Sequence, residues 1–152
     1  MGNRALVIGY EDIQEVSIER YDEICDAVEG GIELFNIPLI EGVDLYVNVD
    51  GLSVQYPNRA IRANKAMEEM GYYRQLTLPG YIGETVKTGE IYTVLYGPIL
   101  AIGFNSETGE NVSLSDEQVL AVRHAFRNNG PMGPASGLAV TFVVKQMMEA
   151  EG

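Results

Sequence analysis

Residues 90–104 read EIYTVLYGPILAIGF, and this stretch decides the class of fold. It contains two short apolar runs, which a Gly97-Pro98 pair divides. Short apolar runs bounded by turn residues are typical of strands buried in a sheet, and glycine next to proline marks a break between elements. The stretch therefore predicts two consecutive strands that contribute to the core.

Four further strands are predicted upstream. Residues 4–9 (RALVIG) form an apolar run that a glycine ends, and residues 32–37 form another that Pro38 closes. Residues 14–18 and 43–49 alternate between polar and apolar side chains, which is the pattern of a strand with one face in the core. Together these segments predict a small, mainly antiparallel sheet.

Two helices have clear signals. Residues 21–28 place apolar side chains at positions i, i+3, i+4 and i+7, and a Gly-Gly pair follows. Ser115 and Gln118 have the spacing of a capping box, in which each side chain bonds the backbone N–H of the other residue. Residues 119–126 continue from this cap with an apolar face.

A third helix is predicted over residues 57–71, because Pro57 suits a first helical turn and Gly71 suits the position after a last turn. The apolar residues that share one face of it are Ala60, Ala63, Met67 and Met70. The complete pattern predicts an α+β fold, a single compact domain in which two to four helices pack on the small sheet.

Charge restricts the classes of partner. The 152 residues include 22 acidic and ten basic side chains, for a formal net charge of −12. Such a surface repels a phosphate backbone, so direct nucleic-acid binding is not expected. Two interpretations of the charge remain: it provides ordinary solubility, or it imitates nucleic acid for a DNA-binding protein.

No signal for export or for a membrane is visible. No apolar run approaches the about 20 residues that a helix needs to cross a bilayer, and the apolar stretch at residues 5–8 is too short for a signal peptide. Cys25 is the single cysteine, so no disulfide can form within the chain. We therefore expect a cytoplasmic protein that has no contact with membranes.

Residues suited to catalysis or metal binding are scarce. His124 is the single histidine, and its place beside the apolar face of a helix is more typical of packing than of a general base. A zinc site needs several His or Cys ligands, and no phosphate-binding glycine motif is present. We expect a protein that is not an enzyme and has no metal or cofactor; a nucleotide-degrading enzyme with a carboxylate-bound metal remains an alternative.

Several short motifs occur in one order along residues 5–126. They are VEGGIE at 28–33, VNVDG at 47–51, PNRA at 57–60, the apolar run at 90–103 and SLSDEQV at 113–119. In this order and spacing the chain resembles the family called domain of unknown function 3846. The resemblance implies a compact α+β domain without an established activity, carried by phages and mobile elements.

Two parts of the chain depart from the family pattern. Residues 62–90 look longer than the family norm, and residues 130–152 have no counterpart in it. We divide the chain into an α+β core at 1–129, which includes this longer insertion, and a C-terminal part at 130–152. This last part combines a Gly/Pro loop with an apolar segment, which we expect to contact a second copy in a homo-oligomer.

Binding residues are predicted in the PNRA segment and just after it. Arg59, Arg62 and Lys65 gather a large share of the few cations, which suits a compact anion such as a phosphate or carboxylate. On the predicted helix, Asn58 would lie where free backbone N–H groups bind phosphate, and Tyr56 could stack on a base. The alternative is a solvated helix face on which these cations pair with neighbouring carboxylates.

The first functional hypothesis is a non-enzymatic binding protein of a phage or mobile element. It would sequester a small anionic, nucleotide-type ligand and so counter host defence. The second is an acidic protein–protein inhibitor, a DNA mimic that binds a host DNA-binding or defence protein. Binding to a host protein that weakens steeply with added salt would distinguish the second hypothesis from the first.

Overall fold

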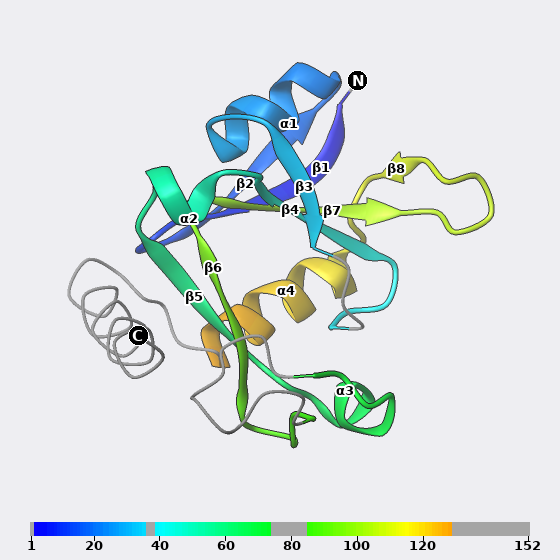
Figure 1. The fold of residues 1–152 in the computed structure, drawn as a ribbon. Helices are drawn as coiled ribbons and strands as arrows, with labels where there is room; N and C mark the ends of the chain where they lie inside the picture. The colour runs from blue at the N-terminus through cyan, green and yellow to red at the C-terminus, as the bar shows by residue number, and fades with distance from the viewer. Residues whose placement is uncertain (1, 36–38, 74–84, 129–152) are drawn as a thin grey trace.

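The computed structural model of the chain describes residues 2–35, 39–73 and 85–128. Its main sheet is antiparallel throughout, in the order β2-β1-β7-β4-β3, with β8 paired to the end of β7. The strands are β1 (Asn3–Ile8), β2 (Ile13–Ile18), β3 (Ile32–Phe35), β4 (Val43–Asn48), β7 (Ile99–Phe104) and β8 (Asn111–Val112). The predicted strands are confirmed within the described residues, outside which the last two positions of the strand predicted over 32–37 lie. The expected α+β class is confirmed with them (Figure 1).

The central strand β7 is buried on both faces. Residues 99–102 have no exposed surface, and their side chains alternate between two separate apolar clusters. Successive side chains of a strand point to opposite faces of the sheet, so a continuous apolar run is what a doubly covered strand requires. This is why residues 99–104 (ILAIGF) show no polar alternation.

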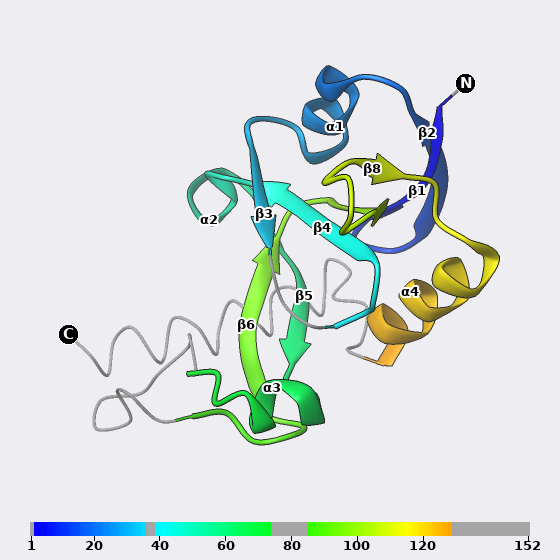
Figure 2. The same ribbon diagram turned by 90° about the vertical axis from the view of Figure 1, so that its right-hand side faces the viewer.

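A helix or a hairpin covers each face of the main sheet. The helix α1 (Tyr21–Val28) buries Ile24 and Val28 against one face. The opposite face carries α4 (Asp116–Asn128), which inserts Val122 and Phe126 into the larger apolar cluster. Figure 2 shows α1 and α4 on opposite sides of the strands.

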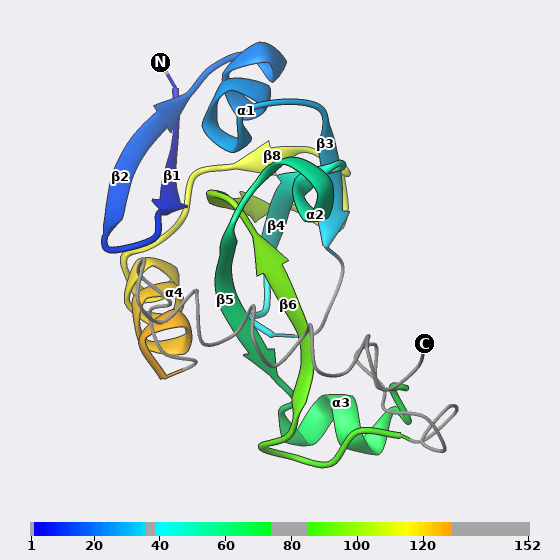
Figure 3. The same cartoon turned by 60° about the vertical axis from the view of Figure 1, so that its left-hand side comes forward.

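A second, two-stranded sheet packs beside α4. It consists of β5 (Pro57–Arg62) and β6 (Ile91–Tyr96), which pair antiparallel. Ile61 and Leu95 belong to the same apolar cluster as Phe126, so this two-stranded sheet and α4 together cover that face of the main sheet (Figure 3). The chain passes from this small sheet to the main one at Gly97, which adopts φ +73°.

The helix predicted over residues 57–71 is wrong for its first half. Residues 57–62 form the strand β5, and the helix α3 (Lys65–Glu69) begins only after Asn64, whose Oδ1 accepts a hydrogen bond of 2.9 Å from the backbone N–H of Met67. A further short helix, α2 (Gly51–Val54), precedes β5. Residues 58–61 of β5 are all buried, and this burial overrides the helical spacing of Ala60 and Ala63.

The predicted C-terminal part lies outside the described residues, as does the expected end of α4 at Asn129-Gly130. The described portion of the 62–90 insertion contains α3 and an isolated bridge between Tyr73 and Thr85. Met67, Val86 and Tyr92 form a small apolar cluster of their own there. The described residues of this segment are therefore anchored where β5 ends and β6 begins.

Candidate functional site

The first candidate site centres on Arg59, whose side chain is buried in β5. Only 2% of the residue is exposed. Its Nη1 donates to Oδ1 of Asn58 at 2.6 Å, to the backbone oxygen of Asn58 at 3.3 Å and to the backbone oxygen of Tyr10 at 3.4 Å. These three acceptors are neutral, so none of them neutralises the positive charge of the guanidinium.

No carboxylate in the described part of the chain forms an ion pair with Arg59. Its Nε is buried and has no hydrogen-bond partner among the residues that the structure describes. Burial lowers the pKa of the Arg59 guanidinium from its ordinary value, because the charged form loses its solvation. An enclosed cation with an unused donor is uncommon, since leaving a buried charge without a counter-ion costs on the order of several kcal/mol.

Asn58 holds this part of the structure together. Its Nδ2 donates to the backbone oxygen of Ile8 at 2.9 Å and to that of Gly97 at 2.8 Å, and the residue is fully buried. The prediction that Asn58 marks a helix start is wrong, because it lies within β5. Its amide is fully used by the protein, so its role here is to position Arg59.

Tyr10 connects Arg59 with Tyr56. The backbone oxygen of Tyr10 accepts from Arg59, while its hydroxyl interacts with the backbone of Tyr56. Burial raises the pKa of the Tyr10 hydroxyl, and the hydrogen bond with the Tyr56 backbone partly offsets this effect. The Tyr56 side chain itself is 76% exposed, so an aromatic ring is available to solvent at the start of β5.

Arg62 and Lys65 lie away from this group, at the other end of β5. Arg62 is exposed, and its Nη1 donates to the backbone oxygen of Gly89 at 3.0 Å. Lys65 pairs with Glu69 along α3 at 3.9 Å. Arg62 lies three positions after Arg59 along the strand, which corresponds to about 10 Å of backbone. The five predicted residues thus divide into Tyr56, Asn58 and Arg59 at one end and Arg62 and Lys65 at the other.

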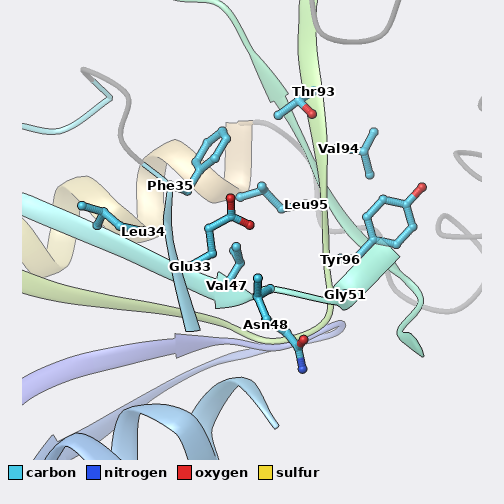
Figure 4. Close-up of a pocket in the computed structure, with 11 residues that line it drawn as sticks. Glu33, Leu34, Phe35, Val47, Asn48, Gly51, Thr93, Val94, Leu95 and Tyr96 are labelled. Atoms are coloured by element: carbon cyan, nitrogen blue, oxygen red, sulfur yellow. The ribbon is translucent and has the colours of Figure 1, made fainter. Parts of the chain in front are cut away.

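A second candidate site is a pocket of about 240 Å³ that sequence reasoning missed. Residues 33–35, 47–49 and 93–96 line it together with Gly51, so β3, β4 and β6 each contribute a wall (Figure 4). Most of its side chains are apolar, and Glu33 is the single charged residue among them. Strands distant in sequence form the pocket, so only knowledge of their spatial arrangement could have revealed it.

The described residues offer no group of three or more His, Cys, Asp or Glu side chains placed to hold a metal ion. None of their helices has both the length and the apolar character to cross a membrane.

Comparison with protein families gives one match. The family model described as Domain of unknown function (DUF3846) matches residues 4–127, from β1 to the last turn of α4. The chain belongs to this family. No curated protein and no solved structure matches it.

The DUF3846 match confirms the resemblance seen in the short motifs, and the fold explains two of them. In VNVDG, Asn48 donates to the backbone oxygens of Val28 and Glu29, each at 3.2 Å, which ties β4 to the end of α1. In PNRA, Asn58 and Arg59 form the buried polar group described above. The family description names no activity, so the functional assignment rests on the geometry of these residues.

Proposed function

We propose that this DUF3846 domain is a non-enzymatic binding protein that captures a small anionic ligand at Arg59. The observation that carries the proposal is the buried guanidinium, which within the described residues has only neutral acceptors and an unused Nε donor. The chain has 22 carboxylates, yet none in the described part pairs with this cation. An anionic ligand would supply the missing counter-ion.

Tyr56 supports a nucleotide-type ligand. Its ring is exposed three residues before Arg59 in sequence, and its backbone is linked to the Arg59 group through Tyr10. A phosphate on Arg59 and a base on Tyr56 would use both features, since base–aromatic stacking contributes about 1–3 kcal/mol per base. In this proposal Arg62 and Lys65 contribute charge to the surroundings and no direct contact.

In a phage or mobile element, such a domain would sequester a nucleotide-type signal and so weaken host defence. This step needs affinity alone, because a captured ligand is withheld without being converted. About 8 kcal/mol of binding free energy gives a micromolar dissociation constant.

Isothermal titration calorimetry with inorganic phosphate, adenosine monophosphate, a cyclic dinucleotide and neutral adenosine tests the proposal. We expect the anions to bind and adenosine to bind at least tenfold more weakly. Arg59→Gln should abolish binding of every anion, whereas Tyr56→Ala should weaken the nucleotides about tenfold and leave phosphate unchanged. Arg62→Gln and Lys65→Gln remove the same charge from exposed positions, and each should change affinity less than twofold.

Two results would overturn this assignment. One is the absence of binding by all three anions. The other is equal binding by wild type and a Tyr56→Ala, Arg59→Gln double variant that remains folded by circular dichroism. Chromatography of the ligand after incubation tests the non-enzymatic part, because any conversion product would contradict it.

The second candidate function is a protein–protein inhibitor that acts as a DNA mimic. The region that favours it is residues 2–29, which holds eight carboxylates and two arginines. Both arginines are already paired, Arg4 with Glu15 and Asp116, and Arg20 with Asp22. If this region imitates DNA, the domain should compete with duplex DNA for a basic DNA-binding protein, and added salt should abolish the competition.

A further inference from the structure

The pocket beside β6 lies against two strands that each pair on one side only in the described part of the structure. Residues 93–96 of β6 and residues 33–35 of β3 line it as unbroken runs. Neighbouring side chains of a strand point to opposite faces, so a wall made of three or four consecutive residues includes the main chain of the strand. The pocket is therefore a slot lined in part by the main chain of β3 and β6.

Both edges lack a strand partner in the described part of the structure. β3 is the last strand of the main sheet and pairs only with β4. β6 pairs only with β5. An unpaired edge presents a row of backbone N–H and C=O groups that can pair with another extended chain.

The side chains of the slot indicate the chemistry of its occupant. Phe35, Val47 and Leu95 provide an apolar floor, and the carboxylate of Glu33 points into the space between the strands (Figure 4). Within the described residues Glu33 has no ion pair, and no cation lines the slot. A chain of net charge −12 reinforces the attraction for a positive group.

We infer that this slot binds an extended peptide segment of a partner protein, which adds as a strand to the free edge of β6 and places a Lys or Arg side chain on Glu33. Main-chain hydrogen bonds to β6 provide affinity, and alternate side chains on the apolar floor and Glu33 provide specificity, as in other cases of strand addition. A second copy of this acidic chain is a poorer occupant, because its own charge opposes the approach.

The test uses fluorescence anisotropy with a labelled peptide of alternating character, Thr-Val-Lys-Val-Thr with blocked ends. We expect saturable binding that falls at least tenfold when Lys is replaced by Glu. Methylation of alternate backbone nitrogens should abolish binding, since it removes the hydrogen-bond donors of an added strand. In the protein, Glu33→Gln should weaken binding about fivefold or more. Glu107→Gln makes the same charge change on an exposed turn, and we expect it to alter binding less than twofold.

Amide hydrogen exchange locates the peptide. We expect added protection from exchange at residues 93–96 on binding. The Arg59→Gln variant should bind the peptide as wild type does, and this control separates peptide binding from anion binding at Arg59. Equal binding of the methylated peptide, or equal effects of Glu33→Gln and Glu107→Gln, would overturn the inference. So would concentration-dependent dimers of the free chain protected at residues 33–35 and 93–96, because they would assign the slot to a second copy.

Discussion

Oδ1 of Asn58 accepts a hydrogen bond of 2.6 Å from Nη1 of Arg59, so two adjacent residues of one strand are joined through their side chains. Adjacent side chains of a regular strand point apart. The pairing register of β5 with β6 shifts between Pro57 and Arg59, and this irregularity places Asn58 at a break in the ladder. The polar group at the start of β5 is therefore a product of the bulge.

Replacing Asn58 with Leu should destabilise the domain by about 2–4 kcal/mol. The substitution keeps the volume but removes the donor for the buried oxygens of Ile8 and Gly97, and each orphaned group costs about 1–3 kcal/mol. Urea unfolding measures the change. A loss below 1 kcal/mol would show that Asn58 does not hold β1 to the turn after β6.

Asn58→Asp should abolish phosphate binding although Arg59 remains in place. The new carboxylate would lie at hydrogen-bond distance from Nη1 and neutralise the guanidinium from within the protein. Calorimetry with inorganic phosphate, on protein shown to be folded by its NMR dispersion, gives the answer. Wild-type affinity in a folded Asn58→Asp variant would contradict a role for the uncompensated charge.

Gly97→Ala should destabilise the fold more than Gly71→Ala. Both glycines have positive φ, +73° and +75°, so alanine costs each about 1 kcal/mol of backbone strain. An added Cβ at Gly97 would overlap the side-chain amide of Gln55, whereas at Gly71 it would meet no atom within 4 Å. We expect about 2 kcal/mol at Gly97, because Gln55 must also give up its 3.0 Å hydrogen bond to the Val28 oxygen, which keeps Asn48 as its other donor. Equal unfolding midpoints for the two variants would contradict this contact.

Asp44→Asn should stabilise the domain at neutral pH and not at low pH. Burial raises the pKa of the Asp44 carboxyl above its ordinary value of 3.8, and a hydrogen bond with Asn111 partly opposes the effect. Between the ordinary and the raised pKa the folded state binds more protons than the unfolded state, so the wild type loses stability as pH rises through that window. Thermal melting from pH 3 to pH 7 should show an advantage of the variant that grows with pH. A constant difference would exclude titration of Asp44 as the cause.

Short sequence patterns correctly predicted those helices whose ends are fixed by interactions between residues close in sequence. The capping box is present as predicted, with Ser115 N–H bonded to Gln118 Oε1 at 3.0 Å and Gln118 N–H bonded to Ser115 Oγ at 3.1 Å. The helix at residues 21–28 also has the predicted bounds. In both cases the side-chain hydrogen bonds at the helix start join residues no more than four positions apart in sequence.

The strand β5 could not be predicted in the same way. Residues 58–61 are all buried, so they show no alternation, and two alanines at helical spacing suggested a helix instead. One local signal was overlooked: Asn64 is a favourable N-cap residue, and it marks the true start of α3. The slot between β3 and β6 had no local signal, because it depends on strands about 60 residues apart.

The position of β7 at the centre of the sheet has a consequence for how the protein is made. Its neighbours β1 and β4 leave the ribosome first, and the strand that joins them follows only with residues 99–104. Until then the nascent chain can form two separate hairpins, β1–β2 and β3–β4, each with an apolar edge open to pairing. Folding must wait for these distant segments to meet, which slows it. A transcript cut before codon 104 would yield an aggregation-prone fragment and no smaller working version of the domain.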